Sequence, residues 1–298
     1  MTTLAIIGPG AVGTSLAHAL ENCALDVDLL GRRDETLTFH EYATSETHTI
    51  KVKALQNAKK RYDWLMIAVK TTQLDAILPD ITRLIHPNTR IILAQNGYGQ
   101  HQKISHPHVY PAVVYISGQK EAQQVTHFRD YRLLIQQNPS TQALQDIVKP
   151  SQLDLRLESD IDTHIWYKLL VNLGINSVTA LARETAKVLQ DDAMTELCRH
   201  LIEEGRQVAQ AEGIDFAPSL VEDIMHIYAG YPDDMGTSMY YDLMHQRPLE
   251  VENIQGYLYQ CAIKHQLNTC LLYTSDAADD KGDVYKRQLL NWSIFPFK

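Results

Sequence analysis

Short apolar runs alternate with helical patterns through the first half of the chain. Four apolar runs predict strands, at residues 3–7, 25–30, 64–69 and 90–95. Helical spacing of apolar residues appears between them, at 12–20 and 74–85. Further strand-like runs lie around 109–117 and 131–135. Apolar strands that alternate with helices predict a parallel sheet that is covered on both faces.

The pattern changes near residue 158, after which helical periodicity dominates to about residue 267. Segment 161–181 predicts one helix followed by the start of a second. A further helix ends at Gly213 in a C-cap position, another has Pro218 at its start, and the last covers 251–267. The chain is therefore expected to hold an α/β domain at 1–157 and an all-α domain at 158–269.

Residues 270–298 fit neither pattern. They contain an acidic stretch, then Lys-Arg-Gln, then an aromatic end, with no sustained period. Two interpretations stay open: an irregular native tail, and a scar of cloning or sequence assembly. This segment is excluded from the functional argument.

Composition narrows the class of protein. A length of 298 residues fits two domains, and 45% hydrophobic with 21% charged residues excludes collagen, a disordered chain and a coiled coil. The formal charge of −9 argues against a nucleic-acid partner, and an anionic ligand would need a local cationic site. Four cysteines without a CxxC pair, no apolar run of about 20 residues and no basic leader predict a soluble cytoplasmic protein with no membrane partner.

A glycine motif follows the first predicted strand and opens a helix. Gly8-Pro9-Gly10-Ala11-Val12-Gly13 has the spacing G-x-G-x-x-G, which in this context is typical of dinucleotide binding. Gly8 permits the tight turn, Gly10 lets the backbone approach a pyrophosphate, and Gly13 lets helix and strand pack closely. The helix N-terminus then offers unpaired N–H groups to the phosphates.

The end of the second strand indicates which dinucleotide binds. NAD-binding chains usually carry Asp or Glu there, for the ribose 2′-hydroxyl. Here the strand ends in Gly31-Arg32-Arg33, and guanidinium groups suit a 2′-phosphate. Arg32 is assigned to NADP, and the role of Arg33 is left open.

A polar stripe interrupts the most apolar predicted helix. Lys168, Asn172 and Asn176 are spaced at i, i+4 and i+8, so they share one helix face among apolar neighbours. The stripe spans about 12 Å of helix rise, the size of a small polar metabolite. Buried polar groups cost free energy unless they are bonded, so the stripe is either a substrate site or a network between helices.

Seven motifs, in order, resemble the ketopantoate reductase family. They are GPGAVG at 8–13, Arg32, AVKTTQ at 68–73, QNGYG at 95–99, WYKLLVNLGIN at 166–176, TSMYYDL at 237–243 and RPLEVENIQG at 247–256. The resemblance implies a Rossmann-type domain followed by an all-α domain, as in the 6-phosphogluconate-dehydrogenase-like fold group. It also implies reduction of 2-dehydropantoate to pantoate with NADPH, in pantothenate and coenzyme A synthesis.

The resemblance assigns two catalytic residues. Lys168 matches the family's catalytic lysine, the general acid at the ketone oxygen, and Glu250 matches an acidic residue near that lysine and the substrate. Hydride transfer to a ketone carbon develops negative charge on oxygen, which an ammonium group can stabilise and protonate. No metal is required for this chemistry.

The remaining matches are binding residues. Asn172 and Asn176 match asparagines that hold substrate hydroxyl groups, and Ser238 matches the serine that receives the substrate carboxylate. Asn96 matches the asparagine beside the nicotinamide, where it also faces the substrate, and Lys70 matches a lysine that lines the same cleft.

Two alternatives remain for the function. One is a relative that reduces another 2-oxo acid or acts on a 3-hydroxy acid; the other is a non-catalytic NADP-binding sensor, although a sensor has no need of a general acid. Whether the chain reduces 2-dehydropantoate or another 2-oxo acid, its partner is a small-molecule acid. The chain is expected to be a monomer or a homodimer. After Thr269 the sequence departs from the family, whose members continue with a Pro-containing turn and a closing helix.

Overall fold

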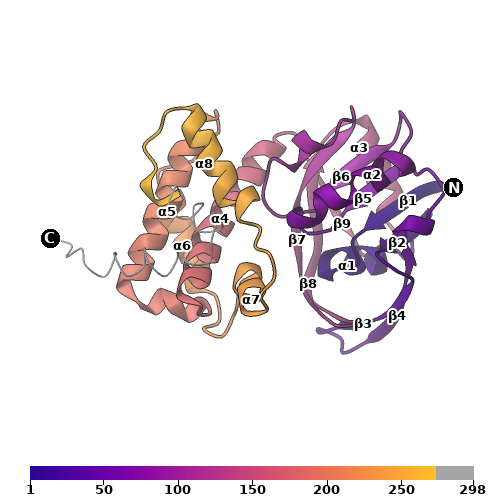
Figure 1. The fold of residues 1–298 in the computed structure, drawn as a ribbon, viewed down its shortest axis with the longest axis horizontal. Coiled ribbons are helices and arrows are strands. Elements are labelled where there is room, and N and C mark those ends of the chain that lie inside the picture. Colours follow the sequence, from indigo (N-terminus) through magenta and orange to yellow (C-terminus); the bar gives the residue numbers. More distant parts are fainter. Residues whose placement is uncertain (273–298) are drawn as a thin grey trace. The chain divides into compact units, whose positions relative to one another are not determined.

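A computed structural model describes residues 1–272 of the chain. The contacts divide the chain into two compact units, Met1–Ile165 and a second that begins at Trp166 (Figure 1). The first is an α/β unit, and the described part of the second consists of helices. The division between Ile165 and Trp166 falls within the first two turns of a helix, eight residues after the predicted boundary at 157/158.

Five parallel strands form the centre of the first unit. In spatial order they are β2 (Leu25–Gly31), β1 (Thr2–Ile7), β5 (Trp64–Ile67), β6 (Arg90–Leu93) and β7 (Val109–Glu121). All four residues of β5 are buried, as expected of a strand with apolar layers on both sides. The predicted parallel sheet is confirmed for this centre.

The rest of the sheet is mixed, so the expectation of a wholly parallel sheet was wrong at its edges. The added strands are β3 (Glu35–Glu41), β4 (Thr47–Ala54), β8 (Gln124–Gln136) and β9 (Asp154–Glu158). β3 pairs antiparallel with β4, and β7 with β8. β3 also pairs with β8, which closes eight strands into a ring. β3 and β4 alternate buried and exposed positions, the pattern of strands with one solvated face.

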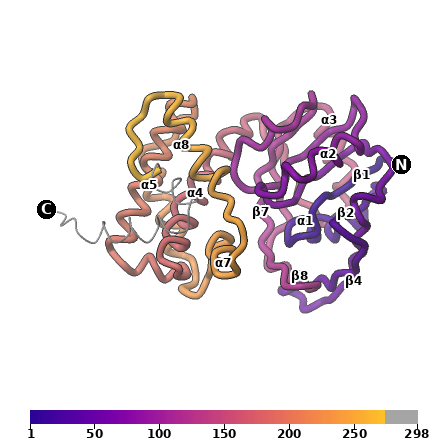
Figure 2. Tube along the Cα trace, in the orientation of Figure 1, coloured from indigo at the N-terminus to yellow at the C-terminus, as the bar shows by residue number. Residues whose placement is uncertain are grey.

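Two apolar layers cover the central strands. Helix α2 (Leu74–Leu84) packs on one face through Leu74, Ile81 and Leu84. Helix α1 (Ala11–Ala19) packs against β7, β8, β2 and β1 on the other (Figure 2). Its residues from Gly13 to Ala19 are all buried. Helix α3 (Pro139–Val148), capped by Asn138, joins the α1 side through buried residues Leu144 and Val148.

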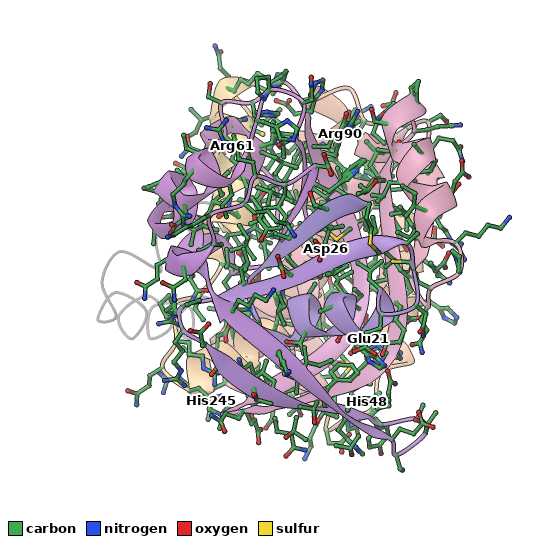
Figure 3. The ribbon with its side chains drawn as sticks, turned by 90° about the vertical axis from the view of Figure 1, so that its right-hand side faces the viewer. Glu21, Asp26, His48, Arg61, Arg90 and His245 are labelled. Atoms are coloured by element: carbon green, nitrogen blue, oxygen red, sulfur yellow. The ribbon has the colours of Figure 1, made fainter. Side chains whose placement is uncertain are left out.

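The C-terminal end of α1 is buried among aromatic rings. The His18 ring centroid lies 4.3 Å from that of His48 and 4.6 Å from that of Phe39. His48 and Glu21 are labelled beside this end of the helix in Figure 3. Burial lowers the pKa of His18, more than Glu21 raises it. His18 at this end of α1 is therefore packed among rings, unlike the end that follows the glycine loop.

The second unit is built on one long helix, α4 (Ile161–Ala182). The start of a second helix, which was expected within 161–181, is not found, because α4 is continuous over that segment. Gly174 fits inside the helix because a Cβ there would lie 2.8 Å from Tyr228 Oη and 3.0 Å from Cys198 Sγ. The glycine is thus a point of close packing, and the helix continues through it.

Four further helices follow: α5 (Asp192–Ala211), α6 (Leu220–Ala229), α7 (Ser238–Met244) and α8 (Gln255–Lys264). The predicted end of α5 is confirmed, since Gly213 has a φ of +87° two residues after its last turn. Pro218 lies just before the N-cap of α6, Ser219. Within residues 1–272 no helix is long and apolar enough to cross a membrane. Of the predicted tail at 270–298, residues 270–272 are described and helical, and 273–298 lie outside the described residues.

Candidate functional site

The glycine loop joins β1 to α1 with the conformation that its sequence predicts. The Gly8 N–H donates to the Leu30 carbonyl at 2.9 Å, and Gly8 has a φ of +112°. A Cβ on Gly8 would lie 2.6 Å from the Val69 backbone nitrogen, and one on Gly13 would overlap the Gly8 carbonyl oxygen. Gly8 and Gly13 are therefore required by the fold itself.

Gly10 differs from its two companions. A Cβ built on Gly10 would meet nothing within 4 Å. Gly10 is also the N-cap of α1 and makes no side-chain capping bond. No side chain caps the first N–H groups of α1, and the space beside the Gly10 Cα is open, which fits a pyrophosphate. The predicted residues Gly8, Pro9, Gly10, Ala11, Val12 and Gly13 would surround this group, with N–H donors from Gly10 onward, since Pro9 has none and the Gly8 N–H bonds Leu30.

The other predicted cofactor residues of this unit lie at the same edge. Arg32 follows β2, Lys70 follows β5 and Asn96 follows β6, all at the carboxyl ends of parallel strands. The Gln95 side chain donates to the Val69 carbonyl at 2.7 Å and so ties the ends of β5 and β6 together. This edge is the usual ligand position in open α/β sheets.

The two arginines after β2 have different environments. Arg33 donates through Nε and Nη2 to Glu35 Oε2, at 3.3 and 3.2 Å. Arg32 is exposed. Arg33 thus turns toward Glu35, and Arg32 stays the predicted partner of the 2′-phosphate.

The polar stripe lies on one face of α4 because the helix is continuous. Lys168 and Asn172 are half-buried, and Asn176 is 4% exposed. Burial disfavours the Lys168 ammonium group and lowers its pKa from 10.5 to about 8. A lysine with this pKa can give up a proton near neutral pH, which an ordinary surface lysine does rarely.

Two hydrogen bonds bring the distant motifs of the second unit to α4. Thr237, the N-cap of α7, shares a 2.8 Å hydrogen bond with Thr179, one turn beyond Asn176. Exposed Ser238 therefore begins α7 beside the end of the stripe.

Gln255, at the start of α8, donates to the Ser177 hydroxyl at 2.8 Å. Half-buried Glu250 lies five residues before it, at the N-cap of a short 3-10 helix (Val251–Asn253). Lys168, Asn172, Asn176, Ser238 and Glu250 are thus parts of one unit whose segments are joined around α4.

Three residues of these sites were not anticipated. Thr237 and Gln255 fix the segments that carry Ser238 and Glu250, and Lys120 on β7 donates to the Pro9 carbonyl at 2.7 Å. Thr237 could have been found, since Thr before a short apolar run is a typical N-cap. Gln255 and Lys120 carry no local signal, because their partners are 78 and 111 residues away.

Comparison with known proteins agrees with these motifs. The N-terminal model of ketopantoate reductase PanE/ApbA matches residues 4–140, and its C-terminal model matches residues 160–274. A 2-dehydropantoate 2-reductase of Mycobacterium tuberculosis is 30% identical over 279 residues, covering 90% of this chain and 93% of the relative. That of Caulobacter vibrioides is 26% identical over 277 residues, covering 90% and 95%.

Solved structures agree as well. A dimeric ketopantoate reductase from Staphylococcus aureus superposes with a TM-score of 0.91 at 49% identity, covering 96% of this chain and 99% of that one. A D-mandelate dehydrogenase solved with NADH superposes with a TM-score of 0.82 at 20% identity, covering 94% and 100%, and shows likeness of fold alone. With both family models matching in order over most of its length, this chain belongs to the ketopantoate reductase family.

Proposed function

We propose that this chain reduces 2-dehydropantoate to pantoate with NADPH, in pantothenate and coenzyme A synthesis. The observation that carries the proposal is the polar face of α4, where Lys168, with a pKa near 8, is followed by two asparagines on the same face. Relatives whose names state this activity match 90% of the chain, which supports the choice of substrate.

The proposed roles follow from the chemistry of each group. NADPH supplies the hydride when it is bound. Lys168 donates a hydrogen bond and then the proton to the ketone oxygen, while Glu250 holds the ammonium group or a substrate hydroxyl in place. Asn172 and Asn176 bind substrate hydroxyl groups, and Ser238, at the start of α7, receives the carboxylate.

The cofactor is held by the first unit in this proposal. The backbone of residues 8–13 binds the pyrophosphate, Arg32 binds the 2′-phosphate, and Asn96 and Lys70 lie toward the nicotinamide. Asn96 also faces the substrate. The open surface above Gly10 and the exposure of Arg32 support these assignments.

The finer description of the molecule is part of the same proposal. Residues 1–157 act as the NADP-binding Rossmann-type domain and 158–269 as the substrate domain, in the manner of the 6-phosphogluconate-dehydrogenase-like fold group. A homodimer is proposed because the Staphylococcus aureus structure is that of a dimer. Four free cysteines support a reducing, cytoplasmic setting.

The test is NADPH oxidation, followed by absorbance, with 2-dehydropantoate and a panel of other 2-oxo acids. We expect the highest kcat/KM with 2-dehydropantoate. A higher value with another 2-oxo acid would make the chain a related reductase of that acid. NADPH binding without turnover of any acid would support the sensor and overturn the proposal.

A further inference from the structure

A lysine from β7 reaches the glycine loop. Its Nζ donates to the Pro9 carbonyl oxygen at 2.7 Å and lies 3.6 Å from Glu35 Oε1. This residue is Lys120, whose side chain is 24% exposed. β7 approaches the loop closely here, since a Cβ on Gly118 would lie 3.5 Å from that of Ala11.

Glu35 connects this lysine to the arginines after β2. Its carboxylate is 12% exposed and binds Arg33 through Oε2 and Lys120 through Oε1. The neighbouring carboxylate of Asp34 accepts from the Ala54 N–H at 2.8 Å and so faces β4. Glu35 thus pairs with two cations, Arg33 and Lys120, and of these two Lys120 also contacts the glycine loop, through the Pro9 carbonyl.

The position of Pro9 places this group beside the predicted 2′-phosphate site. A Cβ on Gly31 would lie 2.7 Å from Pro9 Cγ, so the proline ring covers the end of β2 just before Arg32. Lys120 reaches the carbonyl of that same proline. The lysine therefore lies between the glycine loop and the Arg32 segment.

We propose that Lys120 is a specificity-determining residue for the adenosine 2′-phosphate, acting together with Arg32. The inference rests on the proposed use of NADPH. A partly buried ammonium group, already placed by Pro9 and Glu35, loses little side-chain freedom when a phosphate arrives, so its charge favours the phosphorylated nucleotide. In this proposal the charge of Lys120 favours NADPH over NADH, whereas the hydrogen bond from Lys120 to Pro9 positions the glycine loop.

Two substitutions separate charge from position. Lys120→Gln removes the charge and keeps an N–H donor for the Pro9 carbonyl; Lys120→Met removes both. Lys120→Arg keeps the positive charge on a different side chain. Lys149→Met is the control, because Lys149 follows α3 near Gln152, whose N–H donates to Ala19 at the opposite end of α1 from the loop.

The measurement is calorimetric binding of NADPH, NADH, adenosine 2′,5′-bisphosphate and 5′-AMP, with melting temperatures to verify folding. We expect Lys120→Gln and Lys120→Met to weaken NADPH and the bisphosphate about tenfold and to leave NADH and 5′-AMP within about twofold. Lys120→Arg should bind NADPH and the bisphosphate nearly as tightly as the wild type, and Lys149→Met should show no loss of binding.

Equal losses for phosphorylated and unphosphorylated ligands, or no loss in Lys120→Gln, would overturn the inference and leave Lys120 a structural tether. Failure of the proposed cofactor is distinguishable, since the wild-type protein would then not prefer NADPH to NADH.

Discussion

The glycine loop and the polar face of α4 differ in the groups that they offer to a ligand. The loop offers backbone N–H groups at the start of α1, within six consecutive residues, so its geometry is local, and close contacts require glycine at positions 8 and 13. The α4 site offers side chains spaced four residues apart, and it depends on segments attached through Thr237 and Gln255, 58 and 78 residues away. A backbone site is fixed by conformation, whereas a side-chain site is fixed by long-range packing.

The largest effect is expected on kcat, and it should distinguish the catalytic residue of α4 from the residues of α4 that bind substrate. Lys168→Ala should lower kcat by roughly 10²–10⁴, because a proton donor acts most strongly in the transition state. Asn172→Ala and Asn176→Ala should mainly raise KM, since binding residues act on ground and transition states alike. Steady-state kinetics decides the matter, and an unchanged kcat in Lys168→Ala would remove the lysine from the catalytic role.

Within the loop, two glycine substitutions should fail in different ways. Gly10→Ala adds a methyl group to open space, so the protein should fold normally while NADPH binding weakens by about tenfold or more. Gly8→Ala must accept a φ of +112° and a contact of 2.6 Å, so it should lose about 2–4 kcal/mol of folding free energy. Thermal unfolding measures the loss of stability, and calorimetry measures the loss of NADPH binding. A destabilised Gly10→Ala, or a Gly8→Ala of wild-type stability, would contradict the assignment of Gly10 to the cofactor and Gly8 to the fold.

A smaller effect on NADPH binding is expected at Arg32, the side chain next to the glycine loop that is predicted to bind the 2′-phosphate. Arg32→Ala should weaken NADPH binding about ten- to a hundredfold and leave NADH nearly unchanged, because only NADPH carries the 2′-phosphate. Arg33→Ala is the matched control, since Glu35 already pairs with that guanidinium group. Equal losses for both cofactors in Arg32→Ala would contradict the assignment.

The sequence was sufficient wherever the structure follows local rules. The five central strands, the glycine loop and the helical half were predicted because apolar periodicity and glycine spacing act over a few residues. The closure of the sheet by β3 and β8 was not, because it depends on pairing across more than 80 residues. The start of a second helix within 161–181 was predicted wrongly, because α4 is continuous through Gly174, whose close contacts with Tyr228 and Cys198 come from segments distant in sequence.

The candidate residues divide in the same way. Arg32 was assigned from its place after the second predicted strand, whereas Lys70 and Asn96 were assigned by resemblance. Ser238 and Glu250 were placed only by resemblance, and the contacts of Lys120 with Pro9 and Glu35 became visible only once β7 had been positioned.

The central claim is that Lys168 is the proton donor, and the pH dependence of kcat/KM for 2-dehydropantoate reduction tests it most directly. The donor must be protonated, and its pKa is lowered to about 8. Activity should therefore be constant below that pH and fall about tenfold per unit above it. The residual activity of Lys168→Ala should lack this inflection. A wild-type rate that stays level from pH 7 to pH 10 would contradict the account.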